Sequence, residues 1–198
     1  MIWVTADPHY GHANIIKYCK RPFSSAQEMD EILIRNTNRL VMPSDTLKIV
    51  GDFCMSKNFD TIKYYRDRIN CQNVHLILGN HDYLNEDEYK QIFQKVTHRD
   101  IFKFNGQQVV CDHYSGRIWY NSHRGAWLLW GHSHGAVNDY GLSFDVGVDN
   151  WDLCPLSMNQ ISDIMKVKKQ HHLIKEDKEI IEDRTVVDDS KGIHKEDN

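Results

Sequence analysis

The chain has 198 residues, a formal net charge of -4 at neutral pH and 40% hydrophobic residues. This length and composition suit one globular domain with an appendage, and they exclude a disordered or collagen-like chain. No apolar run approaches the ~20 residues that a bilayer-spanning helix needs, and residues 1–12 do not resemble a secretory signal, so we expect a cytoplasmic protein. The acidic balance gives no support to binding of extended nucleic acid, and the sequence leaves the oligomeric state open.

Strands and helices alternate through the first half of the sequence. Short apolar, β-favouring runs predict buried strands, and apolar residues at helical spacing predict helices between them. In chain order, the expected elements are residues 1–6 (strand), 26–40 (helix), 46–50 (strand), 59–69 (helix), 74–78 (strand) and 86–96 (helix).

The second half is mostly strands. Asn105-Gly106 separates two apolar runs at residues 101–104 and 107–111, and this dipeptide is a strong signal for a β-hairpin. Further strands are predicted at residues 126–130 and 142–148. Alternating strands and helices in the first half, followed by mostly strands in the second, indicate an α/β fold in which mixed sheets have helices outside them.

The composition changes near residue 166. Residues 166–198 contain 8 Lys or Arg, 9 Asp or Glu and no aromatic residue. Such a segment has little apolar surface to bury, so we expect a solvated, charged appendage that is partly helical over residues 173–181. The sequence therefore predicts one catalytic domain over residues 1–165 and an appendage over residues 166–198.

Several predicted strands end in side chains that commonly bind metal ions. Because parallel strands place their carboxyl ends at one edge of a sheet, residues far apart in sequence can converge there. In the two pairs that are spaced i and i+2, extended backbone would point both side chains the same way. In chain order, the candidate ligands are Asp7, His9, Asp52, Asn80, His113, His132 and His134.

The candidate ligands offer oxygen and nitrogen atoms and no thiolate. This donor set suits Mn, Fe, Zn or Ni better than a soft metal or an iron–sulfur cluster. Seven ligands are more than one ion uses. If the Asp52 carboxylate is shared, the set can serve two ions ~3.5–4 Å apart.

The ordered blocks Asp-x-His, Gly-Asp, Gly-Asn-His-Asp, His and Gly-His-x-His resemble the signature of the calcineurin-like metallophosphoesterase superfamily. They run from Asp7 to His134, and the resemblance extends over about the first 160 residues. The resemblance implies a two-sheet mixed β-sandwich flanked by helices, in four α-β-β-α layers. The segment GHANIIKYCKRPF is similar to small bacterial and phage members, so we expect a bacterial or phage source. If the protein is encoded by a phage, we expect it in the cytoplasm of the host.

The resemblance also implies a role for each candidate residue. It makes Asp52 the carboxylate that bridges two divalent ions, with manganese expected first and nickel, iron, zinc or magnesium as alternatives. It makes His81 the histidine that faces the scissile phosphate without binding metal. The implied ligands of the first ion are Asp7, His9 and His134, and those of the second are Asn80, His113 and His132.

The implied reaction is hydrolysis of a phosphate monoester or diester by a hydroxide that bridges the two ions. A small nucleotide or a related phosphorylated molecule is the expected substrate. Two alternatives remain: a weakly active metal-binding scaffold of the same fold, and a nuclease or cyclic-nucleotide phosphodiesterase. Met55 and Ser56 stand where phosphoprotein phosphatases of this superfamily have Asp and Arg, which argues against phosphoprotein substrates.

Five further residues are candidates for the substrate side of the site. His12 either lines that side, bonding substrate or a ligand, or caps a helix over residues 15–20. Asn14 and Arg21 reach a phosphate or are solvated at the surface, and His123 and Arg124 hold a phosphate or belong to a solvated loop.

Overall fold

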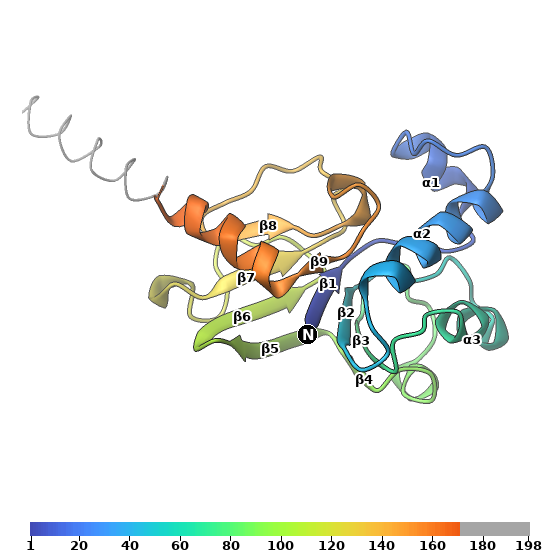
Figure 1. Cartoon of the computed structure of the whole chain (residues 1–198), viewed down its shortest axis with the longest axis horizontal. Helices are drawn as coiled ribbons and strands as arrows, with labels where there is room; N and C mark the ends of the chain where they lie inside the picture. Colours follow the sequence, from blue (N-terminus) through green and yellow to red (C-terminus); the bar gives the residue numbers. More distant parts are fainter. Residues whose placement is uncertain (171–198) are drawn as a thin grey trace, which may run out of the picture.

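The computed structural model describes residues 1–170, and two β-sheets lie at its centre with helices outside them (Figure 1). The helices are α1 (Ala13–Tyr18), α2 (Ala26–Leu40), α3 (Phe59–Asp67), α4 (Glu86–Tyr89), the short 3-10 helices η1 (Ser122–Arg124) and η2 (Val148–Asn150), and a last helix over residues 158–170. The strands are β1 (Ile2–Thr5), β2 (Thr46–Val50), β3 (Asn73–Ile77), β4 (Lys95–Thr97), β5 (Arg99–Phe104), β6 (Gln107–Asp112), β7 (Trp127–Trp130), β8 (Ser143–Asp145) and β9 (Leu156–Ser157).

Both sheets are mixed. The first has the strand order β4-β3-β2-β1-β9, in which β1 to β4 are parallel and β9 is antiparallel. The second has the order β5-β6-β7-β8, in which β6, β7 and β8 are parallel and β5 is antiparallel. The predicted fold of two mixed sheets flanked by helices is therefore confirmed. The carboxyl ends of β1, β2 and β3 line one edge of the first sheet, as the motif positions require.

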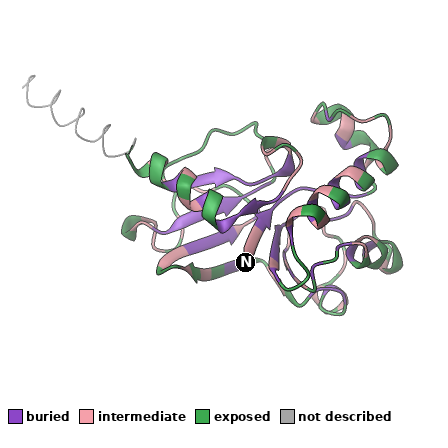
Figure 2. Ribbon diagram, viewed as in Figure 1, coloured by how far each residue is buried: buried purple, intermediate pink, exposed green. Residues whose placement is uncertain are grey.

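The alternation of side chains along the strands builds two separate cores. In β2, Leu47 and Ile49 pack toward the helices, while Val50 packs toward the second sheet. Figure 2 shows the central strands as buried and the outer faces of the helices as exposed. On the outer face of the second sheet, Leu128 and Trp130 pack against Trp119. Because the helices cover one face of the first sheet and the second sheet covers the other, the first sheet is buried on both faces. This explains why its strands read as nearly continuous apolar runs.

Helix α2 has the bounds that its sequence predicts. The Ser25 side chain accepts a hydrogen bond from the backbone N–H of Glu28, so it caps the amino end. Met29 and Leu33 are buried against the first sheet at helical spacing. Helix α3 also forms where expected but ends two residues earlier than predicted, at Asp67.

The predicted helix over residues 86–96 is wrong. Asn85 and Glu88 form a reciprocal capping box that starts α4, yet the helix ends at Tyr89. Residues 95–97 instead form β4, which pairs with β3 in parallel. The β-branched residues Val96 and Thr97 suit this open sheet edge, and strand pairing wins over continuation of a short helix.

The segment after the second sheet also differs in detail from expectation. The strand predicted at residues 142–148 is the shorter β8, because the Asp145 carboxylate accepts a hydrogen bond from the backbone of Gly147 and turns the chain. The last helix, residues 158–170, crosses the predicted domain boundary at residue 165. The helix predicted at residues 173–181 lies outside the described residues. Within residues 1–170, no helix is both long and apolar enough to cross a bilayer.

A buried ion pair joins the two sheets. Lys48 of β2 contacts Asp100 of β5 at 2.5 Å, and both residues are buried. Lys95 of β4 contacts the other oxygen of the same carboxylate at 2.5 Å. Burial opposes ionisation of Asp100, but the hydrogen bonds from Lys48 and Lys95 outweigh it and lower its pKa. The pair is therefore intact at neutral pH.

Asp100→Asn should lower the free energy of unfolding by ~3–5 kcal/mol at pH 7, because it leaves the Lys48 charge buried without its partner. The difference from wild type should shrink as the pH falls below ~4, since a carboxylate with a lowered pKa stabilises the fold only while it is ionised. Urea denaturation at several pH values measures this. The control is Asp163→Asn in an exposed pair with Lys166, which should change stability by less than ~1 kcal/mol. Equal effects of both changes would contradict the prediction.

Candidate metal centre

The predicted ligands lie on sharply turned backbone rather than on extended strand. Asp7, His9, Asp52, His132 and His134 all have positive φ angles, of 56°, 53°, 55°, 70° and 49°. Such left-handed backbone is uncommon for residues other than glycine and is concentrated at functional sites. The side chains spaced two residues apart do converge, but the predicted cause, extended backbone, is wrong. The side chains converge because the chain turns at each strand end.

Two glycines let the strand ends approach closely. Gly51 has a φ of 87°, and a Cβ atom there would overlap Nδ1 of His113. A Cβ at Gly131 would lie 2.6 Å from both the Cβ of Ala6 and an Asp7 oxygen. Any larger residue at either position would push apart strand ends from the two sheets.

The turned segments gather six of the candidate ligands into two groups. One donor atom from each member lies within 4.8 Å of the others in its group. The first group is Asp7, His9 and His134, and the second is Asp52, His113 and His132.

The Asp52 carboxylate lies between the two groups. Its Oδ2 atom is 3.4 Å from Nε2 of His9, which belongs to the first group. Its Oδ1 atom is 3.5 Å from Nε2 of His113, which belongs to the second group. Asn80 joins the second group, because its side-chain oxygen is 3.0 Å from the same His113 nitrogen. The structure thus brings together all seven candidate ligands.

The site concentrates charge out of contact with water. Burial raises the pKa of Asp7 well above its usual range, and repulsion from the Asp52 and Asp145 carboxylates adds to the effect. Burial also lowers the pKa of His9 to about 2, so its ring is neutral and able to bind a cation. Within residues 1–170, neither Asp7 Oδ1 nor His9 Nε2 has a hydrogen-bond partner. Buried polar atoms are rarely left unpaired, and divalent cations fit this donor set.

Arg21 supports the first group from behind. Its guanidinium donates to both Asp149 oxygens, at 2.7 and 2.8 Å. The other N–H groups reach the carbonyl oxygens of Asp7 and Pro8 and the sulfur of Met29. The side chain is 1% exposed and all five donors are used. Both the surface position and the phosphate contact considered for Arg21 are therefore wrong: it holds the turned backbone after β1.

Two of the histidine ligands are oriented by a hydrogen bond from Nδ1 of the ring to a protein oxygen. Asp149 accepts from Nδ1 of His134 at 2.7 Å, and the Val50 carbonyl accepts from Nδ1 of His113 at 2.9 Å. Each contact places the proton on Nδ1 and leaves Nε2 free to bind metal. Burial opposes ionisation of Asp149, but the hydrogen bonds from Arg21 and His134 outweigh it and lower its pKa to about 2.

Asp82 organises backbone rather than the neighbouring histidine ring. Its carboxylate accepts hydrogen bonds from the backbone N–H groups of Gly79, Asp52 and Phe53, at 2.8, 3.0 and 3.0 Å. Burial raises its pKa to about 7, although these amides favour the ionised form. Asp82 thus ties the end of β2 to the end of β3, and it makes no contact with the ring of His81 among the hydrogen bonds of the described residues.

Asp145, the last residue of β8, holds the backbone that follows β7, as Asp82 holds the backbone that follows β2 and β3. Its carboxylate accepts from the Ser133 hydroxyl and from the backbone of Gly135 and Gly147, at 2.8, 3.1 and 2.7 Å. These bonds fix the turn that carries His132 and His134. Sequence reasoning missed Asp145 and Asp149 as supporting residues, since single acidic residues after a strand carry no motif of their own.

His81 lies beside the ligand groups with its ring at the surface of the site. Its ring centroid is 5.4 Å from that of His9, and its backbone N–H donates to Asp52 Oδ1 at 2.8 Å. Nδ1 of its ring is 2.5 Å from the hydroxyl of Tyr83. It belongs to neither ligand group. His81 thus lies next to the ligand groups without joining them, and its implied role toward substrate stays a prediction.

His12 lies beside the first ligand group, on the side of the site that His81 also occupies. It occupies the residue before α1 but makes no side-chain capping bond, so the capping interpretation is wrong. Its Nδ1 is 3.4 Å from Nδ1 of His9, and its ring centroid is 6.5 Å from that of His81. Asn14 is exposed on α1.

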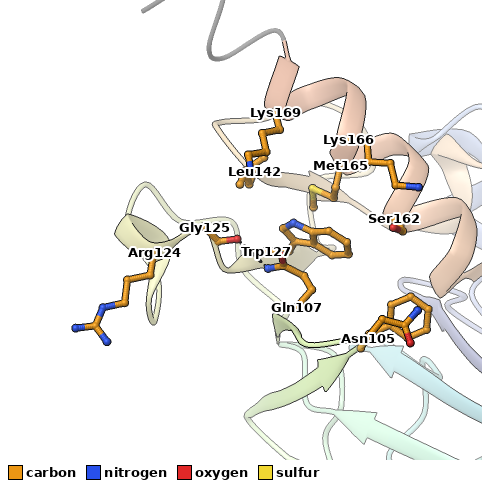
Figure 3. Close-up of a pocket in the computed structure, with 11 residues that line it drawn as sticks. Asn105, Gln107, Arg124, Gly125, Trp127, Leu142, Ser162, Met165, Lys166 and Lys169 are labelled. Carbon is orange, nitrogen blue, oxygen red and sulfur yellow. Dashed lines mark hydrogen bonds between the residues drawn. The ribbon is translucent and has the colours of Figure 1, made fainter.

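The structure places His123 and Arg124 away from the ligand groups, which corrects their assignment to the substrate side. Both are exposed in η1, which precedes the amino end of β7, whereas His132 follows the carboxyl end. Arg124 instead adjoins a cavity of about 350 Å³ (Figure 3). Lys166 and Lys169 of the last helix line the same cavity.

The two-sheet α/β architecture places paired His/Asp groups at its strand ends, where they could hold metal ions. Residues 1–152 match the sequence profile of the calcineurin-like phosphoesterases, and the chain belongs to this family. An uncharacterized protein of Methanocaldococcus jannaschii is 30% identical over 177 residues, covering 85% of this chain and 93% of that protein. A protein of unknown function from Aquifex aeolicus has a similar crystal structure, with a TM-score of 0.67 and 22% identity, over 83% of this chain and 98% of that one. The family assignment supports a metal-dependent phosphoesterase.

Asp52→Asn should abolish binding of divalent metal to at least one of the two groups, because it removes the charge that lies between them. Asp149→Asn should weaken metal binding by roughly 10–100-fold, the usual effect of losing a partner that orients a ligand. Titration of the metal-free protein with Mn²⁺ by calorimetry measures both. The matched control, Asp60→Asn at an exposed position of α3, should bind like wild type. Two ions bound at wild-type affinity by Asp52→Asn would contradict the role of Asp52.

Proposed function

We propose that the chain hydrolyses phosphate esters at a dinuclear metal centre formed by the two ligand groups. The observation that carries the proposal is the position of Asp52, whose two oxygens face His9 on one side and His113 on the other. Bound divalent cations would activate water for attack at phosphorus and neutralise charge on the phosphoryl oxygens. The nitrogen and oxygen donors suit manganese, iron, zinc or nickel better than a soft metal. Of these, manganese is the ion expected first, and magnesium is a further alternative.

His81 is the group best placed to donate a proton to the leaving oxygen. Its ring lies beside the first group, and the bond from its backbone to Asp52 fixes it next to the shared carboxylate. Histidine exchanges protons near neutral pH, which suits a general acid. His12 contributes a second imidazole on the same side. Its contact with His9 orients that ligand and leaves Nε2 of His12 available to a phosphate oxygen.

A small nucleotide is the substrate that the rim of the site favours. The ring of Tyr114 is exposed and lies 4.9 Å from that of His132 and 5.1 Å from that of His113. Tyr18 is exposed beside His12, at 6.3 Å between ring centroids. Exposed aromatic rings at the edge of a phosphate site offer stacking faces to a base. Phosphoproteins are disfavoured, since Met55 and Ser56 supply no arginine clamp and Arg21 is fully used inside the fold.

The experiment that tests this proposal compares the metal-free protein with the protein reconstituted with Mn²⁺, Ni²⁺, Zn²⁺ or Mg²⁺. The substrates are bis-p-nitrophenyl phosphate, nucleotide monoesters and diesters, cyclic nucleotides and a sugar phosphate. We expect turnover only with metal, lower KM for nucleotides than for the sugar phosphate, and loss of activity with a chelator. Binding of two ions without turnover of any substrate would instead favour a metal-binding scaffold.

His81→Ala separates proton donation from metal binding. Loss of a proton donor should reduce kcat by ~10²–10⁴-fold while both ions stay bound. The reduction should be largest for alkyl leaving groups, which need a proton, and smaller for p-nitrophenolate, which does not. Steady-state kinetics with elemental analysis of the purified variant check this. Loss of an ion together with an equal reduction for both substrate types would identify His81 as a ligand.

A further inference from the structure

We propose that Tyr83 is a positioning residue for His81. The proposal rests on the proposed function, because it assigns a partner to the histidine that donates the proton. The feature that carries it is the 2.5 Å contact between the Tyr83 hydroxyl and Nδ1 of His81. Within residues 1–170 this is the hydrogen bond that the His81 ring makes, and it leaves Nε2 of the ring without a protein partner.

No carboxylate hydrogen-bonds to the ring of His81 within residues 1–170. Met55 stands where phosphoprotein phosphatases of this superfamily have Asp, so no carboxylate comes from that position. Asp82 is adjacent to His81 in sequence, but its two oxygens accept three backbone hydrogen bonds from the ends of β2 and β3. Tyr83, two residues after His81 in the sequence, contacts the ring instead.

The Tyr83 side chain is itself held in place. Its hydroxyl lies 3.6 Å from the sulfur of Met55, to which it donates. Nζ of Lys57 lies 5.3 Å from the centre of its ring, a cation–π contact. The ring meets that of His81 edge-on, at 86°. Because the Tyr83 hydroxyl donates to Met55, the Tyr83 oxygen can accept from Nδ1 of His81 when that nitrogen carries the proton.

A neutral hydroxyl suits this site better than another carboxylate would. Asp7, Asp52 and Asp82 already place three buried or half-buried carboxyl groups near the end of the first sheet. A fourth negative charge next to them would add repulsion that the fold would have to offset. The phenol accepts the Nδ1–H bond and fixes the ring without adding charge.

Tyr83→Phe removes only the hydroxyl and should lower kcat by roughly 3–10-fold, the effect of losing one neutral hydrogen bond. KM should stay within about 2-fold of wild type and both ions should remain bound, since Tyr83 contacts no ligand. The reduction should be larger for alkyl than for p-nitrophenyl esters. The matched control is Tyr120→Phe, at an exposed position near η1, which should leave kcat unchanged.

The decisive comparison places Tyr83→Phe in the His81→Ala background. If Tyr83 acts through His81, Tyr83→Phe should lower kcat by less than about 2-fold in the His81→Ala protein, because the effects of the two substitutions are then not additive. Full additivity would overturn the proposal. Wild-type protein without any phosphoesterase activity would overturn the proposed function instead, so the two failures are distinct.

A second readout needs no turnover. In the metal-free protein, nitrogen-15 shifts of the His81 ring report which nitrogen carries the proton. Wild type should hold a single Nδ1–H tautomer, and Tyr83→Phe should show a mixture of both tautomers. Identical tautomer populations in the two proteins, together with an unchanged kcat, would show that the Tyr83 contact does not position the ring.

Discussion

The arrangement of this molecule depends on one unfavourable feature: the Asp7 and Asp52 carboxylates are both buried at the same edge of the first sheet, away from water. Their charges repel, and burial removes the solvent that would screen them. Each is carried on left-handed backbone, which adds conformational cost. Hydrogen bonds from Arg21 to the Asp7 carbonyl and from the Asp52 backbone to Asp82 hold that backbone in place. A fold that assembles so many compensating contacts around two carboxylates is built to receive positive charge.

Much of the site was predictable because its signals are local. The sequence blocks that contain Asp7, His9, Asp52 and His132 follow apolar runs, and parallel strand ends necessarily meet at one edge. The supporting residues were not predictable in the same way. Arg21 reads as a surface residue after a short helix, and its burial depends on Asp149, 128 positions later. Such a pairing has no periodicity or spacing that a single sequence reveals.

The fold shows the same division between local and distant causes. The hairpin at Asn105-Gly106 and the cap at Ser25 are decided within a few residues, and both form as expected. The formation of β4 depends on a different part of the chain. Residues 95–97 form a strand instead of the predicted helix because β3 offers them an unpaired edge. His123 and Arg124 illustrate the converse error, since a histidine and an arginine next to a strand look functional until the direction of that strand is known.

The ligands are distributed over 127 positions between Asp7 and His134, and they come from strand ends of both sheets. An unfolded chain offers only isolated pairs such as His132 and His134, so a cation has little to bind before the sheets have met. Nearly all of the binding free energy then belongs to the folded state. By mass action, free metal at a hundred times its dissociation constant would stabilise the fold by about 2.7 kcal/mol. The metal supply of the cell would thereby set how long each copy of the protein survives, as well as whether it works.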